Sequence, residues 1–251
     1  MCTDCGCTAQ KEHTVHSRDN TQVHTLANEP IVIDVHQSLL FENDKQATRN
    51  REQLIQHNIT AINLMSSPGS GKTALLERTI DELAGKHRIA VIEGDLETEN
   101  DARRIRAKGV DAIQITTGSA CHLDALMIAN ALQQLDLKKI DLLFIENVGN
   151  LVCPASFDLG QHHNVTLLST TEGDDKPEKY PVIFRAADLV LISKSDLLAV
   201  LDDFDPRRAR QSLASITGNT PLLQLSAKTG DGFDQWTEWL HNSTLTHQQV
   251  K

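Results

Sequence analysis

The sequence predicts an α/β protein in which helices cover both faces of a mostly parallel sheet, preceded by a flexible N-terminal arm. After residue 60, short apolar runs rich in Val, Ile and Leu alternate with helical stretches. These runs are almost continuously apolar, which is typical of strands buried on both faces. Residues 1–30 are polar and hold few core-forming side chains. Such a composition favours an extended, solvated arm.

The N-terminal part divides into two predicted segments. Residues 1–30 form the arm, which contains His13, His16 and His24, but no long His run that would indicate a bulk metal store. Residues 31–58 follow as a helix expected to dock onto the main domain, most simply as a packing helix. Its apolar residues are Val35, Leu39, Leu40, Leu54 and Ile55.

The main domain is predicted over residues 59–245. Strands are expected at residues 61–65, 89–93, 111–116, 141–146, 165–170, 187–193 and 221–226. Helices are expected at residues 74–85, 100–109, 121–135, 206–216 and 233–242. Helical crossovers join parallel strands, so this alternation predicts one sheet with helices on both faces.

Composition and charge exclude several classes of partner. The net charge is −10 and the pI about 5.5, so binding of nucleic acid through bulk positive charge is not expected. No apolar run reaches the ~18 residues of a membrane span, and none follows the N-terminus as a signal. A cytoplasmic location without a membrane partner is therefore expected. Thiols stay reduced there, so the five cysteines indicate metal or redox sites.

A phosphate-binding loop is predicted between the first strand and the first helix of the domain. The stretch "SSPGSGKTA" offers backbone N–H groups and a helix N-terminus to an anion. Lys72 is expected at the β- and γ-phosphates, and the Thr73 hydroxyl on Mg²⁺. Ser66 stands where the loop usually begins with Gly, so the strict pattern fails at one position. The nucleotide-contacting residues are predicted to be Gly69, Ser70, Gly71, Lys72, Thr73 and Ala74.

Two acidic residues are predicted to serve the metal or the attacking water. Glu146 ends the strand "DLLFIE", and Gly149 follows at the position that contacts the γ-phosphate through its N–H. Asp95 follows the strand "IAVIE" and either orients water or caps the next helix. Together with Lys72 and Thr73, these two carboxylates are the candidate catalytic residues.

The segment "SKSD" predicts a guanine base. Guanine presents N1–H and N2–H₂ side by side, and the carboxylate of Asp196 can accept both, whereas adenine offers a lone pair there. Lys194 precedes it, and Ser226, Ala227 and Lys228 supply the partner loop "SAK". Ser193 replaces the Asn of the usual Asn-Lys-x-Asp pattern. GTP is therefore the predicted nucleotide.

A metal site is predicted from Cys121, His122 and Cys153. Cys153 lies four residues beyond Gly149, in a segment expected to move when GTP becomes GDP. Two thiolates and an imidazole suit Zn²⁺ or Ni²⁺. The alternatives are a buried thiol that acts as a small apolar side chain and a histidine that caps the helix.

The N-terminal "CTDCGC" predicts a second metal site, at Cys2, Cys5 and Cys7. A structural zinc ribbon needs another Cys pair, which the sequence lacks. Three thiolates with the α-amine, whose pKa is about 8, suit square-planar Ni²⁺, although Zn²⁺ also accepts thiolates. A redox Cys-x-x-Cys is the alternative.

With these residues in place, the chain resembles the HypB family of hydrogenase-maturation GTPases over about residues 60–240 and at the N-terminal tip. The resemblance is carried by "CTDCGC", "SSPGSGKT", "EGD", "CH" and "ENVGNLVCP". It implies a SIMIBI-type G domain that dimerises with GTP, with the Cys121, His122 and Cys153 site at the dimer interface. It also implies tight nickel binding at Cys2, Cys5 and Cys7, and as partners the accessory protein HypA and the hydrogenase large subunit.

Three alternatives remain. The related GTPase family that serves urease carries a Cys-Pro-His motif, which this sequence lacks. A non-enzymatic metal buffer would not need the intact Gly-Lys-Thr, Asp196 and "SAK". A zinc-handling GTPase of similar fold differs from the leading hypothesis in its metal preference.

Overall fold

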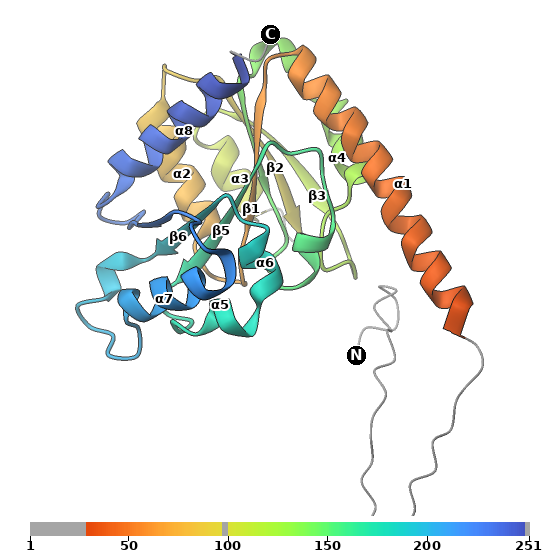
Figure 1. Cartoon of the computed structure of the whole chain (residues 1–251). Helices are drawn as coiled ribbons and strands as arrows, with labels where there is room; N and C mark the ends of the chain where they lie inside the picture. Colours follow the sequence, from red (N-terminus) through yellow and green to blue (C-terminus); the bar gives the residue numbers. More distant parts are fainter. Residues whose placement is uncertain (1–28, 97–99, 249–251) are drawn as a thin grey trace, which may run out of the picture.

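The computed structural model describes residues 29–96 and 100–248, and this part contains one seven-stranded sheet. All neighbouring strands are parallel, in the order β3-β2-β4-β1-β5-β6-β7 (Figure 1). The strands are β1 Thr60–Met65, β2 Ile89–Asp95, β3 Asp111–Thr116, β4 Leu142–Glu146, β5 His163–Ser169, β6 Leu189–Ser193 and β7 Leu222–Gln224. The predicted fold class is confirmed. The predicted arm falls almost wholly outside the described residues.

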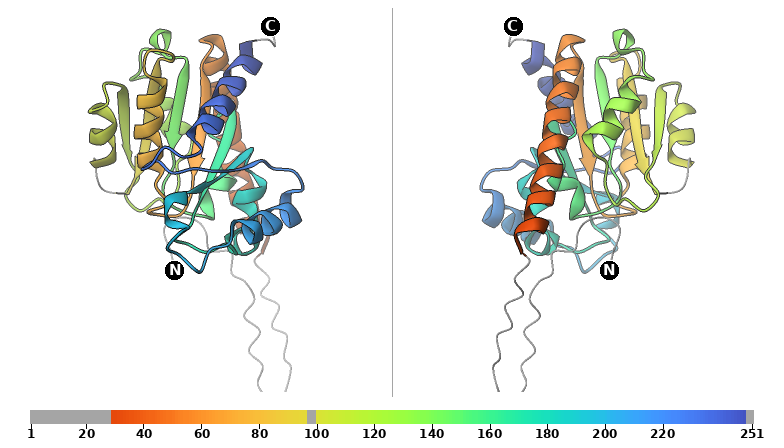
Figure 2. Two further views of the ribbon diagram at one scale, coloured as in Figure 1. Left: turned by 90° about the vertical axis from the view of Figure 1, so that its left-hand side faces the viewer. Right: turned by 90° about the vertical axis from the view of Figure 1, so that its right-hand side faces the viewer.

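Helices cover both faces of the sheet (Figures 1 and 2). One face packs against α2 Lys72–Leu83, α3 Asn100–Arg106 and α8 Phe233–Gln248. The opposite face packs against α1 Glu29–Gln56, α4 Ala125–Leu132, α6 Pro181–Arg185 and α7 Pro206–Thr217. Short turns of helix complete the chain at η1 Leu137–Lys139, η2 Cys153–Ser156, α5 Lys176–Lys179 and η3 Ser195–Leu197. Strands buried between two helical layers explain the near-continuous apolar runs.

The strand register brings the predicted site residues to one edge of the sheet. β4 lies between β1 and β2, and Glu146 is in register with Leu64 on one side and Glu93 on the other. The carboxyl ends of parallel strands share one edge, so the loops after β1, β2 and β4 meet there. Ligands of open α/β sheets bind at this edge.

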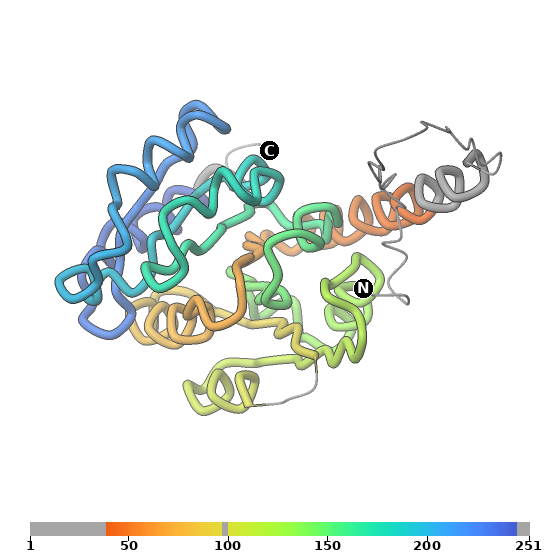
Figure 3. Tube along the Cα trace, turned by 90° about the horizontal axis from the view of Figure 1, so that it is seen from below, coloured from red at the N-terminus to blue at the C-terminus, as the bar shows by residue number. Residues whose placement is uncertain are grey.

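Helix α1 differs from its prediction in the face it buries. It spans Glu29–Gln56, two residues earlier at each end than expected, and is about 42 Å long at 1.5 Å per residue. It extends past the sheet in Figures 1 and 3. Leu54 is buried, but Leu39 is 62% and Ile55 49% exposed, so the docking role expected of these two was wrong. The inner face carries Ala47 and Asn50 instead, which apolar periodicity does not reveal.

Within residues 29–96 and 100–248, no helix combines the length and the apolar character needed to cross a lipid bilayer.

Candidate nucleotide and metal sites

The predicted phosphate loop connects β1 to α2. Gly69 and Gly71 adopt φ values of 73° and 95°, which favour glycine and turn the loop back onto the start of α2. Lys72 Nζ donates to Ser66 Oγ at 3.0 Å, so the serine that replaces the usual first glycine supports the lysine. The loop therefore has the strand–loop–helix setting that an anion site needs.

A cavity of about 360 Å³ opens beside this loop. Most predicted phosphate and metal residues line it, namely Gly69, Gly71, Lys72, Thr73, Ala74, Asp95, Glu146 and Gly149. A Cβ on Gly149 would lie 2.8 Å from the Pro68 Cα, so this glycine permits close contact with the loop. Ser70 is buried instead, and its hydroxyl donates to Glu172 Oε1 at 2.5 Å.

Three carboxylates meet at the inner wall of the cavity. Oxygen atoms of Glu93, Asp101 and Glu146 all lie within 4.8 Å of one another. Thr73 Oγ1 donates to Glu146 Oε1 at 3.0 Å. Among the described residues, one oxygen of Glu93 and one of Glu146 is buried without a hydrogen-bond partner. Hard oxygen ligands around such atoms fit Mg²⁺.

Burial changes the ionisation of this cluster. Burial, reinforced by the neighbouring Glu146, raises the pKa of Glu93 to about 11. Burial also raises the pKa of Glu146, although the charge of Lys72 opposes the shift. Buried carboxyls favour their neutral form unless a cation compensates them. A divalent ion would therefore replace protons here.

Sequence reasoning missed Glu93 and Asp101. Glu93 lies inside a strand whose other residues up to Gly94 are buried, and an acidic residue there is rare unless it is paired. An acidic residue within a predicted buried strand was therefore the feature of the sequence that could have identified Glu93. Asp95 lies at the end of β2, outside the three-carboxylate cluster, and its Oδ1 accepts from the N–H of Leu96 at 2.7 Å.

The two segments predicted to read the base, residues 193–196 and 226–228, contact each other beside the phosphate loop. Asp196 Oδ1 accepts a hydrogen bond of 2.6 Å from Ser226 Oγ. The N–H of Lys228 donates to the same serine hydroxyl at 3.2 Å, which fixes the turn that includes Ala227. A carboxylate held in this way can accept from the edge of a purine.

Two contacts join this region to the phosphate loop. Ser193 Oγ donates to the Ser70 carbonyl at 2.7 Å, and Lys194 Nζ donates to the Gly69 carbonyl at 2.7 Å. Ser193 is buried. The serine that departs from the usual Asn thus makes a specific contact that holds the two parts of the site together.

The predicted Cys121, His122 and Cys153 do meet. Their ligand atoms lie within 4.8 Å of one another, and the two sulfur atoms are 3.1 Å apart. The His122 ring stacks on Phe157 with centroids 3.9 Å apart. Burial lowers the pKa of His122, partly offset by Asp124, so its neutral, metal-binding form is favoured. Two thiols and an imidazole fit Ni²⁺ or Zn²⁺.

The local structure around this group differs from the prediction. Helix α4 begins at Ala125, and Asp124 caps it by accepting from the N–H of Met127. Cys121 and His122 therefore lie in the preceding loop, and His122 is not the helix cap. Cys2, Cys5 and Cys7 lie outside the described residues.

The segment after β4 contacts both sites. The N–H of Asn150 donates to the Ser66 carbonyl at 2.8 Å, and its side chain donates to the Cys121 carbonyl at 3.3 Å. Asn147 Oδ1 accepts from the N–H of Leu123 at 3.2 Å. Asn150 thus connects the phosphate loop to the loop that carries Cys121 and His122, and Asn147 connects the end of that loop to β1.

Comparison with known proteins gives consistent matches. The family model "CobW/HypB/UreG, nucleotide-binding domain" matches residues 60–224. The hydrogenase maturation factor HypB of Azotobacter vinelandii is 48% identical over 220 residues, covering 88% of this chain and 72% of that protein.

Two solved structures are also similar. HypB from Helicobacter pylori, crystallised in complex with nickel, is 42% identical with a TM-score of 0.79, covering 84% of this chain and 98% of that one. HypB from Archaeoglobus fulgidus is 41% identical with a TM-score of 0.76, covering 82% and 100%.

Replacing Glu93 by Gln should flatten the pH dependence of stability in the nucleotide-free, metal-free protein. The pKa of Glu93 rises from 4.5 to about 11 on folding. The stabilising contribution of the protonated side chain to the free energy of unfolding is therefore complete below pH 4.5 and is lost as the pH rises toward about 11. Between about pH 5.5 and about pH 8.5, the free energy of unfolding of the unsubstituted protein should fall by roughly 1–4 kcal/mol more than that of Glu93→Gln. Urea unfolding measures this. Equal losses in the two proteins, with exposed Glu238→Gln as control, would contradict it.

Replacing Ser193 by Ala should weaken nucleotide binding about five- to tenfold, the equivalent of one buried hydrogen bond of about 1 kcal/mol. The variant leaves the Ser70 carbonyl without this donor, so the phosphate loop and the base-reading loop lose their fixed spacing. Titration of a fluorescent guanine nucleotide measures the change. Ser215→Ala, on α7 and bonded only within its own helix, is the matched control. An unchanged affinity in Ser193→Ala would show that this contact is dispensable.

Proposed function

This chain belongs to the HypB family of hydrogenase maturation factors, and from that premise we propose that it is a GTP-hydrolysing nickel metallochaperone. In this proposal it helps to insert nickel into the large subunit of [NiFe]-hydrogenase. The nickel complex of the Helicobacter pylori relative supports the choice of metal. The half-buried group of two thiols and one imidazole supports it from the chemistry of this chain itself.

The contacts of Asn150 carry the proposal that nucleotide state controls the metal site. One residue contacts Ser66 at the start of the phosphate loop and Cys121 in the metal-binding group. Cys153 follows three residues later on the same segment. A change in the position of this segment on hydrolysis would therefore alter the spacing of Cys121, His122 and Cys153.

The nucleotide chemistry follows from the cavity beside the phosphate loop. Lys72 neutralises the β- and γ-phosphates, and Thr73 and Glu146 hold Mg²⁺, with Glu93 and Asp101 near enough to join them. Bound Mg²⁺ supplies charge neutralisation for the phosphates. Asp95, at the outer end of β2, orients the attacking water. The reaction is the slow, regulatory cleavage of GTP to GDP and phosphate.

The choice of GTP rests on the base-reading end of the site. Asp196 is held by Ser226, and Lys194 is held against the phosphate loop. A carboxylate there accepts from both N–H groups of guanine and opposes the N1 lone pair of adenine.

The remaining roles extend the proposal to partners. GTP binding closes a homodimer with the Cys121, His122 and Cys153 group at its interface. Cys2, Cys5 and Cys7 capture nickel before transfer, and HypA and the hydrogenase large subunit are the protein partners. The protein acts in the cytoplasm. Zn²⁺ remains an alternative occupant of both sites, since thiolates and imidazole also suit that ion.

A strain that lacks this chain should lose hydrogenase activity and recover it with excess nickel. Chains carrying Lys72→Ala or Cys121→Ser should fail to restore activity at low nickel, whereas exposed Lys86→Ala should restore it. Hydrogenase and urease activities are assayed in parallel. Loss of urease alone would favour the urease-serving alternative. Full activity with Lys72→Ala would refute the GTPase and favour a metal buffer.

Asn150→Ala should reduce the coupling between nucleotide and metal. In the unsubstituted chain, Ni²⁺ affinity at the Cys121, His122 and Cys153 group should differ at least about fivefold between GDP and a non-hydrolysable GTP analogue. Asn150→Ala should bring this ratio close to one, because the side-chain contact with Cys121 is lost while each ligand still binds. Competition with a coloured chelator measures the affinities. A ratio unchanged by Asn150→Ala, next to the exposed control Asn130→Ala, would assign the coupling elsewhere.

A further inference from the structure

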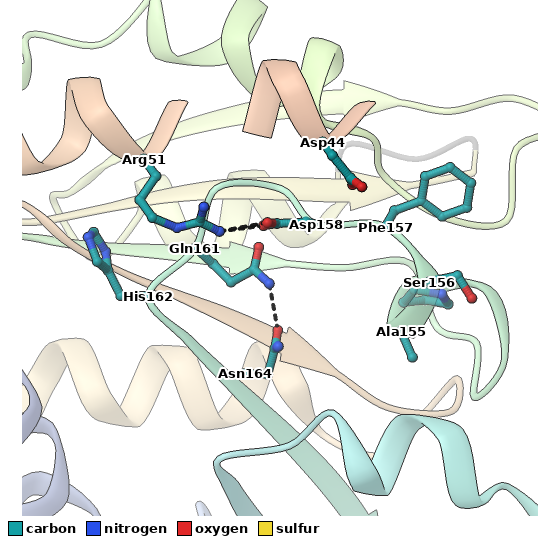
Figure 4. A pocket seen from close by; sticks show the side chains of 10 residues that line it. Asp44, Arg51, Ala155, Ser156, Phe157, Asp158, Gln161, His162 and Asn164 are labelled. Carbon is teal, nitrogen blue, oxygen red and sulfur yellow. Dashed lines mark hydrogen bonds and ion pairs between the residues drawn. The ribbon is translucent and has the colours of Figure 1, made fainter. Parts of the chain in front are cut away.

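Helix α1 lies against the two loops that carry the candidate metal ligands. It contacts the start of α4, three residues after His122, and the segment that follows Cys153. Figure 4 shows the contact between α1 and this second segment. Side chains of both line a hollow of about 530 Å³. The phosphate loop does not line this hollow. The contacts that α1 makes with these two segments are mainly polar.

Asn43 joins the first residue of α4, which follows the Cys121–His122 loop, to the segment that follows Cys153. Its Oδ1 accepts from the N–H of Ala125 at 2.9 Å, and its Nδ2 donates to the carbonyl of Asp158 at 2.9 Å. An amide is the side chain that can accept on one side and donate on the other.

Asn50, two turns further along α1, repeats the arrangement. Its Nδ2 donates to the Ala125 carbonyl at 2.7 Å and to the Leu159 carbonyl at 3.0 Å. Gln46 donates to its Oδ1 at 2.9 Å, so the amide orientation is fixed. Asn50 is 1% exposed, and its loss would leave the carbonyl of the buried Leu159 without this donor.

An ion pair and a ring contact extend this attachment to the metal ligands. Arg51 donates to both carboxylate oxygens of Asp158 at 2.8 and 2.7 Å, one contact of which is visible in Figure 4. Phe157, the neighbour of Asp158, stacks on His122. A Cβ on Gly160 would lie 2.6 Å from the Ala47 carbonyl, so the loop also packs closely on α1.

We propose that Asn43 and Asn50 are positioning residues that set the spacing between the Cys121–His122 loop and the Cys153 loop. Neither side chain is a metal ligand. Each bonds at once to the start of α4, directly after the Cys121–His122 loop, and to residues 158–159 beyond Cys153, so α1 defines the separation of the two thiols and the orientation of the imidazole. This inference rests on the proposed function for the identity of the metal, but the spacing of the thiols is independent of any metal.

The first readout is nickel affinity. The full chain is used with Cys2, Cys5 and Cys7 replaced by Ser, so that Ni²⁺ alone reports the remaining site by its thiolate charge-transfer absorption. Asn43→Ala, at a half-buried position, should weaken Ni²⁺ binding about tenfold, at the lower end of the effect of outer-sphere groups. Asn43→Asp keeps the acceptor for Ala125 but loses the donor to Asp158, and should shift affinity in the same direction.

The second readout needs no metal. Oxidised glutathione converts the thiols of Cys121 and Cys153 to a disulfide and is itself reduced to two glutathione thiols. The equilibrium constant reports how closely the protein holds the two sulfur atoms together. It should fall about tenfold in Asn43→Ala, which would correspond to about 1.4 kcal/mol. Guanine nucleotide affinity should remain unchanged, because Asn43 does not contact the phosphate loop.

Thr48→Ala is the matched control, since this exposed residue of α1 bonds only to the Asp44 carbonyl of its own helix. An unchanged thiol equilibrium in both Asn43 variants would overturn the proposal. A changed thiol equilibrium in a protein that binds no nickel, even before substitution, would support positioning and refute the nickel site of the proposed function. The two failures are therefore distinguishable.

Discussion

The parallel register of β2 with β4 places Glu93 and Glu146 side by side at the inner wall of the cavity beside the phosphate loop. Two carboxyls in a poorly solvated place cannot both ionise without a compensating cation. The surrounding groups address this constraint: Thr73 donates to Glu146, and the charge of Lys72 opposes the rise of its pKa. The phosphate loop, the start of α2 and the end of β4 thus surround carboxyl groups whose negative charge the protein alone stabilises poorly, and which a bound metal–nucleotide complex would neutralise.

The same strand connects this charge to the thiols. β4 ends at Glu146, and the chain then passes Asn147, Gly149 and Asn150 before it reaches Cys153. Asparagine side chains recur along this route because one amide can donate to one backbone and accept from another. Asn147 and Asn150 bond to Leu123 and Cys121 in the loop before α4, whereas the asparagines of α1 bond to Ala125, the first residue of α4. The metal-binding group is therefore attached to its surroundings by two sets of amide contacts, with Cys121 and His122 in a loop and Cys153 at the start of η2.

Much of this arrangement could be predicted from local sequence, for stated physical reasons. Continuous apolar runs predicted the strands, and "GSGKT" after a strand predicted the phosphate loop because that function needs a fixed local geometry. The proximity of Cys121 and His122 to Cys153 was anticipated from the segment beyond Gly149. Glu93 was missed because its partner, Glu146, is distant in sequence and only the strand register brings them together. The docking face of α1 was predicted only at Leu54, because it otherwise depends on Asn43 and Asn50, which apolar periodicity cannot identify, whereas Leu39 and Ile55 are exposed. The start of α4 was placed too early because Asp124, rather than His122, caps it.

The length of α1 has a mechanical consequence. The helix is continuous from Glu29 to Gln56, so its two ends are connected by an unbroken series of backbone hydrogen bonds. At 1.5 Å per residue, its first residue lies about 21 Å from Asn43, and the two asparagines are about 10 Å apart. The distance from Glu29 to Asn43 is thus about twice the distance between Asn43 and Asn50. If α1 turned about Asn43, its first residue would move about twice as far as Asn50. A displacement of the first turn of α1 would therefore reach Ala125 and Asp158 through Asn43 and Asn50.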